Sequence, residues 1–273
     1  MYRPAVPLLV LSLLAASSGS AVAGTSACWF ENGAVVAPAA IGGVSGDFVI
    51  DLSAPRTLLH ETAAQTAGFA DTELSLPVRL AGQRTAATAV TVRDLDYRSV
   101  GFSTPITGVI GADVLDRYVI VLDFAPCRLE LRSRGASPRP SGRALAVTMV
   151  GGTPTVQAAA SNGLRGVSGP FALDTASAGG VRARGAADAP RQKPAGTLRG
   201  LSLDGVLRQD VPAVVAGDLP DGVVGAIGAS VLSAYRLTLD PGASRLWLSP
   251  PRVAPKVALG TAQEKGPGVS AEP

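Results

Sequence analysis

The chain contains an internal repeat, and this repeat limits the possible folds more than any other feature. Shifting the sequence by 117 positions superimposes Val109–Leu131 on Ala226–Leu248 without a gap, and eleven of the 23 aligned pairs are identical. Self-similarity of this kind is typical of a duplicated structural unit. We therefore expect two similar lobes, at residues 24–135 and 144–249, joined by a Gly- and Pro-containing linker at 136–143.

The composition favours short strands within these lobes. The 32 glycines and 21 prolines among 273 residues would interrupt long helices, and a hydrophobic fraction of 47% is too high for a disordered chain. Apolar runs on either side of turn residues predict β-hairpins at 74–92, 119–131 and 237–248. We expect an all-β chain with short helices at 58–67, 114–118 and 231–235, the last two N-capped by Asp113 and Ser230.

The first 23 residues are typical of a secretory signal peptide. Arg3 precedes an apolar run, and Ala21–Ala23 forms a small-residue cleavage site. The run is about a dozen residues long, and a bilayer span needs roughly 20. We expect an exported protein, periplasmic or extracellular, without stable membrane insertion and with a disordered tail at 250–273. In an oxidising compartment Cys28 and Cys127 can form a disulfide; two free buried thiols, or a lipid attached to Cys28, are the alternatives.

The residue inventory argues against most metal, thiol and nucleic-acid chemistry. One histidine, His60, and two cysteines are too few for a Cys/His zinc site, and they leave a single possible base for a Ser-His-Asp triad. The net charge of +3 is not gathered into blocks, so no nucleic-acid partner is indicated. We expect no metal and no cofactor, and carboxylates are the leading candidates for chemistry.

Two aspartates occupy matching places in the two halves. Asp51 ends the apolar run Phe48–Ile50, and Asp174 ends the run Phe171–Leu173. Two carboxylates about 3 Å apart cannot both ionise, so such a pair holds a single proton. The ionised member can take a proton from an attacking water while the protonated member hydrogen-bonds to the developing oxyanion. The other duplicated pair, Asp123 and Asp240, is expected to form hairpin turns with surface ion pairs to Arg128 and Arg245.

Both halves carry the elements of a known motif: an apolar strand, an Asp-Thr/Ser-Gly-like loop, and later a hydrophobic-hydrophobic-Gly strand. These elements are 49-VIDLSA-54 with 109-VIGADVL-115, and 172-ALDTAS-177 with 226-AIGASVL-232. The pattern resembles the pepsin-like and retropepsin-like aspartic proteases, especially bacterial exported forms with both lobes on one chain. The resemblance implies two barrel-type lobes, catalytic Asp51 and Asp174, and a polypeptide substrate in the cleft between the lobes.

The resemblance also assigns supporting roles and shows departures. The active-site loops would be supported by Ser53, Thr175, Ser177, Gly111 and Gly228. In the family the residue after each aspartate bears a hydroxyl that bonds across to the other lobe, which Thr175 can supply and Leu52 cannot. The next position is usually glycine, but it is Ser53 in one lobe and Ala176 in the other. The flap region, 76–95, contains no tyrosine.

The sequence therefore predicts a monomeric, exported, aspartic-type endopeptidase that uses a two-aspartate dyad. The altered loops support a second hypothesis, in which the fold and the cleft persist as a non-catalytic peptide-binding module. A third hypothesis is a disulfide-stabilised binding domain unrelated to proteases.

Overall fold

The protein is described by a computed structural model covering residues 23–135, 140, 143–177, 179–184, 196–214 and 219–252. The predicted signal peptide up to residue 22, most of the predicted linker and tail residues 253–273 lie outside the described residues. None of the helices in this described part is long and apolar enough to span a membrane.

The first lobe is a six-stranded barrel with one additional edge strand. The strands follow the spatial order β2-β3-β4-β8-β5-β7-β6, and pairing of β3 with β6 closes the barrel. The bounds are β2 (Trp29–Glu31), β3 (Ala34–Ile41), β4 (Val44–Ile50), β5 (Thr57–His60), β6 (Glu73–Leu80), β7 (Gln83–Arg93) and β8 (Ile106–Ile110).

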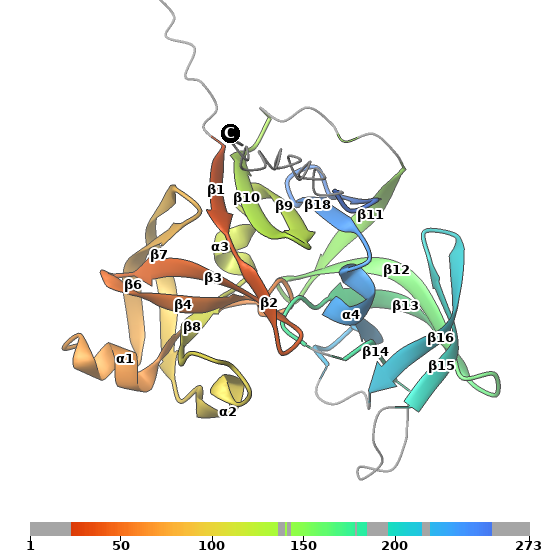
Figure 1. The fold of residues 1–273 in the computed structure, drawn as a ribbon, viewed down its shortest axis with the longest axis horizontal. Helices are drawn as coiled ribbons and strands as arrows, with labels where there is room; N and C mark the ends of the chain where they lie inside the picture. Colours follow the sequence, from red (N-terminus) through yellow and green to blue (C-terminus); the bar gives the residue numbers. More distant parts are fainter. Residues whose placement is uncertain are drawn as a thin grey trace, which may run out of the picture.

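The second lobe repeats this arrangement strand by strand. Its order is β12-β13-β17-β14-β16-β15, closed by pairing of β12 with β15. The bounds are β12 (Thr153–Ser161), β13 (Gly166–Leu173), β14 (Val181–Ala183), β15 (Gly196–Leu203), β16 (Val206–Val214) and β17 (Gly225–Ile227). The two lobes lie side by side in Figure 1. The expected all-β fold with two duplicated barrel-type lobes is therefore confirmed.

Six strands form a joining sheet between the lobes, in the order β1-β10-β9-β18-β19-β11, and pairing of β11 with β12 continues this sheet into the second barrel. Its strands are β1 (Gly24–Ala27), β9 (Tyr118–Phe124), β10 (Cys127–Ser133), β11 (Ala144–Val150), β18 (Arg236–Asp240) and β19 (Arg245–Ser249). At its centre Val121 pairs with Thr238, its own counterpart in the sequence repeat. On either side Leu122 pairs with Leu237, and Ile120 with Leu239. The duplication is thus expressed as an approximate two-fold axis through this strand pair.

The repeated sequence also explains how each barrel is filled. Phe48 and Phe171 are fully buried at equivalent positions. A Cβ on Gly108 would lie 2.7 Å from the Phe48 ring, and one on Gly225 would lie 2.3 Å from the Phe171 ring. Glycine on the neighbouring strand therefore makes room for a large aromatic side chain, and close packing of this kind maintains the density of both cores.

The helices are shorter than the sequence predicted. They are α1 (Glu61–Thr66), α2 (Asp96–Ser99), α3 (Ala112–Leu115) and α4 (Ala229–Leu232). The predicted helix start at Leu58 was wrong, because Leu58 belongs to β5, which fits its alternating burial pattern. The predicted caps were also wrong, since the N-caps of α3 and α4 are Gly111 and Gly228. Asp113 and Ser230 lie inside the helices.

The expected surface ion pair of Asp123 was also wrong. Asp123 is 5% exposed, and its carboxylate lies 3.5 Å from Arg236 Nε and 3.9 Å from Arg252 Nε instead of pairing with Arg128. Asp240 remains a turn residue, as expected, and accepts a hydrogen bond from the Ala243 amide. Within the joining sheet β9 pairs with β18, which begins at Arg236, and this pairing places Asp123 beside cations from the second half of the chain.

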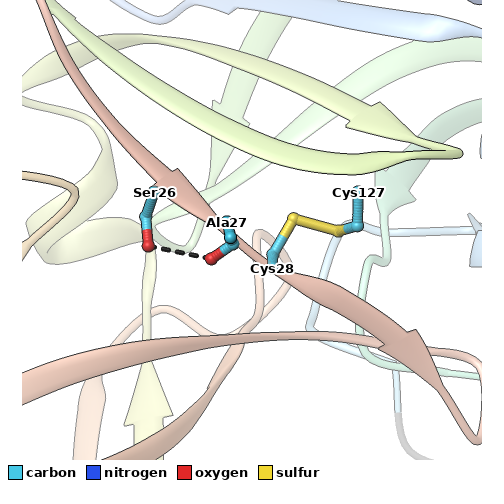
Figure 2. Close-up of a disulfide and its surroundings, with 4 residues drawn as sticks. All are labelled: Ser26, Ala27, Cys28 and Cys127. Atoms are coloured by element: carbon cyan, nitrogen blue, oxygen red, sulfur yellow. Dashed lines mark hydrogen bonds between the residues drawn. A yellow bond between two sulfur atoms is a disulfide. The ribbon is translucent and has the colours of Figure 1, made fainter. Parts of the chain in front are cut away.

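The two cysteines form a disulfide, as the sequence allowed. Figure 2 shows the bond between Cys28, which lies between β1 and β2, and Cys127 at the start of β10. Because both sulfur atoms are in this bond, the structure has neither two free thiols nor a Cys28 thiol available for a lipid. The bond fastens the start of the described chain to the joining sheet beside the first barrel.

Candidate active site

Each of the two predicted aspartates is held at the end of a parallel strand pair. Ile50 pairs with Ile110, and the Asp51 amide then donates to the Ile110 carbonyl at 3.0 Å. In the second lobe the Asp174 amide donates to the Ile227 carbonyl at the same distance. The apolar strands thus bring both carboxylates out of the barrel cores at equivalent points, and Asp51 and Asp174 are only 2% and 3% exposed.

The glycines after β8 and β17 permit a close approach of the backbone. A Cβ on Gly111 would lie 2.6 Å from the carbonyl oxygen of Arg56, and one on Gly228 would lie 2.0 Å from that of Gly179. Both glycines have negative φ, so they serve here to leave space. Other residues could adopt the backbone conformation at these two positions, but their Cβ atoms would not fit, which explains why both repeats carry glycine there.

The loop after Asp51 directs three donors to one carboxylate oxygen. Oδ1 accepts from the Ser53 amide at 2.9 Å, the Ser53 hydroxyl at 2.6 Å and the Ala54 amide at 3.1 Å. Serine at this position therefore does not block the loop, because its side chain turns back to the carboxylate. In the second lobe Asp174 Oδ1 accepts from the Ala176 amide at 3.0 Å, and Ala176 adds no donor of its own.

An arginine contacts the other oxygen of each carboxylate, and the sequence reasoning missed both arginines. Arg98 Nη1 lies 3.1 Å from Asp51 Oδ2, and Arg182 Nη2 lies 2.5 Å from Asp174 Oδ2. Arg98 comes from α2, and Arg182 comes from β14. By strand register Arg182 occupies the place of Leu58 in the first lobe. The sequence therefore has a charged residue in one lobe where the other lobe has leucine, but the two positions can be matched only when the strand pairing is known.

The two aspartates interact electrostatically. Burial raises the pKa of Asp174 above its ordinary value of 3.8, and the charge of Asp51 raises it further, whereas the Arg182 and Arg98 charges and the Ala176 amide oppose the shift. Asp174 therefore keeps a proton to a higher pH than an ordinary aspartate does. Burial lowers the pKa of Arg98, but the Asp51 carboxylate and Tyr97 together outweigh burial, and the net shift is upward.

Cross-lobe hydrogen bonds join the two aspartate loops. The Thr175 hydroxyl donates to the Ile50 carbonyl at 2.6 Å and accepts from the Leu52 amide at 3.1 Å. The Val35 amide donates to the Thr175 carbonyl at 2.9 Å. Leu52 is buried and provides no reciprocal hydroxyl.

A second hydroxyl, also missed from the sequence, supplies part of the opposite contact. The Thr153 hydroxyl donates to the Ser53 carbonyl at 3.0 Å. By strand register Pro154 is the counterpart of Val35, and proline has no N–H with which to repeat the Val35 bond. The hydroxyl of the adjacent threonine thus holds the first loop from the second lobe.

The two aspartates line one cleft of about 730 Å³ between the lobes. Ser53, Ala176 and Ser177 line it beside them, and the Ser177 hydroxyl accepts from the Gly179 amide at 3.3 Å. Tyr97, just beyond the β6–β7 hairpin, lines the cleft from α2 and is 68% exposed. A cleft with two buried carboxylates at its base can accept an extended chain and present a peptide bond to them.

A separate cluster on the first lobe could offer metal ligands. One ligand atom each from His60, Asp94 and Asp96 lies within 4.8 Å of the others. However, His60 Nδ1 accepts from the Thr62 amide, so His60 is the N-cap of α1, and its Nε2 contacts Asp96 at 3.0 Å. Both aspartates are exposed. The cluster is explained by helix capping and a surface contact.

Comparison with known proteins identifies the fold. No protein-family model and no curated protein sequence matches the chain. Among solved structures, it is similar to the crystal structure of the aspartic proteinase from Irpex lacteus, with a TM-score of 0.52 and 12% identity, over 84% of this chain and 98% of that one. Similarity at this low identity concerns the fold alone. The chain thus has the two-lobed, all-β fold of an aspartic proteinase.

Proposed function

We propose that this chain is an exported aspartic-type endopeptidase whose dyad consists of Asp51 and Asp174. The observation that carries the proposal is the convergence of two equivalent, buried aspartates on one cleft, each at the end of a parallel strand pair. The disulfide supports export to an oxidising compartment. Because one chain supplies both aspartates, a monomer suffices for the reaction.

The proposed reaction uses the pair as base and acid. With Asp174 protonated and Asp51 ionised, Asp51 takes a proton from water as the water oxygen bonds to the peptide carbonyl carbon. Asp174 donates its proton to the carbonyl oxygen, which gives a neutral tetrahedral diol. Proton transfer from Asp51 to the amide nitrogen then accompanies C–N cleavage, and the second hydroxyl proton returns to Asp174.

The proposal predicts hydrolysis at acidic to mildly acidic pH. The reactive form needs a proton on Asp174, whose pKa is raised above 3.8. Activity should therefore decline as the pH rises through that raised pKa. A pH–rate profile measured with an unstructured protein substrate checks this direction, and activity that increased steadily up to pH 8 would contradict it.

The direct test replaces the aspartates singly. Asp51→Asn and Asp174→Asn should each reduce hydrolysis of unfolded casein at pH 4 by about 10³-fold. Asp240→Asn is the matched control, because Asp240 is also duplicated but serves a hairpin turn away from the cleft. Full activity in Asp174→Asn would show that the dyad is wrong.

A second candidate function is a non-catalytic peptide-binding module. The two arginine contacts favour it, because Arg98 and Arg182 stabilise the ionised carboxylates and so oppose the shared proton. In that case the wild-type chain binds peptides without cleaving them. Hydrolysis that appeared only in an Arg98→Gln/Arg182→Leu variant would identify the cleft as a suppressed catalytic site.

A further inference from the structure

The cleft contains more cations than the dyad can balance. Of the described residues that line it, four are arginines (Arg56, Arg93, Arg98 and Arg182) and only Asp51 and Asp174 are acidic. Arg98 and Arg182 are each committed to one aspartate. The positive charge in excess of the dyad therefore comes from the two remaining arginines, both of which are exposed.

These two arginines border the cleft beside the parallel β5–β7 pair. Arg56 directly precedes β5, and Thr91 and Arg93 are two residues apart at the end of β7; all three line the cleft. Residues two apart on a strand face the same side. In the parallel β5–β7 pair, Thr57 lies opposite Val90 and His60 opposite Arg93. The two arginines are thus about four residues, roughly 13 Å, apart along the strand direction.

The two arginines differ in their surroundings. Arg93 also borders a second groove, which four acidic residues line with it (Glu61, Asp71, Glu73 and Asp94), so the field around Arg93 is less positive than that around Arg56. Arg56 forms no ion pair with any residue that the structure describes. Arg56 is therefore the stronger attraction for an anionic group in the cleft.

We propose that the cleft selects acidic polypeptide segments, with carboxylate side chains of the bound chain contacting Arg56 and, more weakly, Arg93. The inference rests on the proposed peptide-binding cleft, but it holds whether or not the bound chain is cleaved. An extended ligand rises by about 3.3 Å per residue, so acidic side chains about four positions apart match the spacing of the two arginines.

Binding of a non-hydrolysable peptide tests the proposal separately from catalysis. Three fluorescent octapeptides with a hydroxyethylene isostere at the centre carry Glu, Gln or Lys at both flanks, and fluorescence anisotropy gives their affinities at pH 7. An exposed ion pair contributes about 1.4- to 5-fold in affinity. With two such pairs the Glu peptide should therefore bind roughly 2- to 25-fold more tightly than the Gln peptide in 20 mM salt, and 500 mM salt should remove most of that preference.

Variants assign the effect to named residues. Arg56→Gln should lower the affinity for the Glu peptide several-fold and leave that for the Gln peptide unchanged, and Arg93→Gln should have a smaller effect. Arg128→Gln, an exposed arginine of β10 outside the cleft lining, is the matched control. Equal affinity for the three peptides, or an Arg56→Gln effect no larger than that of the control, would overturn the inference. A retained Glu preference in a chain that hydrolyses nothing would support it while refuting the endopeptidase proposal.

Discussion

Thr175→Val tests whether hydrogen bonds between the lobes hold the aspartate loops together. The substitution replaces a fully buried hydroxyl with a methyl group of similar size, so it creates no cavity. It removes both Oγ1 contacts, leaving the Leu52 amide without that acceptor and the Ile50 carbonyl without that donor. An unsatisfied buried polar group costs about 1–3 kcal/mol, so we expect a loss of roughly 2–4 kcal/mol in the free energy of unfolding.

Two controls make this measurement specific. Thr175→Ser keeps the hydroxyl and should recover most of the stability. Thr238→Val alters a buried threonine whose hydroxyl makes no hydrogen bond to the described residues, and it introduces the residue found at the counterpart Val121. Urea unfolding gives the free energies, and calorimetry should show the Thr175→Val midpoint lowered by roughly 4–16 °C. A Thr175→Val loss no larger than that of Thr238→Val would refute the reasoning.

Three further perturbations test other parts of the structure. Arg182→Leu removes a cation that lowers the pKa of Asp174, so carboxyl NMR titration should show that this pKa rises further. At pH 7 the variant should lose roughly 2–4 kcal/mol in the free energy of unfolding, because it leaves a buried carboxylate without its partner. Because the folded state then binds a proton more tightly than the unfolded state, urea unfolding should show this loss shrinking as the pH falls toward 3.8. Gly228→Ala places a Cβ 2.0 Å from a backbone carbonyl oxygen and should lower the melting temperature by at least several degrees, whereas Gly196→Ala, with open space around it, should not. Replacing both cysteines with alanine removes a cross-link between residues 99 positions apart. In the chain-entropy model this should lower the free energy of unfolding by at most about 4–5 kcal/mol, and a gain in stability would contradict that account.

The sequence pattern was sufficient to predict the fold, but it predicted the ends of the helices less well. The repeat at 117 positions predicted two equivalent lobes, and the turn residues predicted the hairpins that the structure contains. The helix expected from Leu58 failed because pairing with β7 and β8 holds Leu58 in a strand. The proposed helix caps failed because the glycines before them already lie at the N-cap positions. Backbone pairing between distant segments decided the first case, and the position at which each helix begins decided the second.

The sequence by itself determined which residues can form the site: the duplicated Asp51 and Asp174, the space-giving Gly111 and Gly228, and Thr175. The aspartates and glycines are repeated along the chain, so comparison of the two halves is enough to find them, whereas Thr175 stands opposite Leu52 and follows from the resemblance to aspartic proteases. Only the tertiary structure showed that Arg98 and Arg182 contact the aspartates and that Thr153 reaches the opposite loop. Each of these three lies on an element that the repeat does not mark, and each acts across a contact that forms only when strands and lobes pack together.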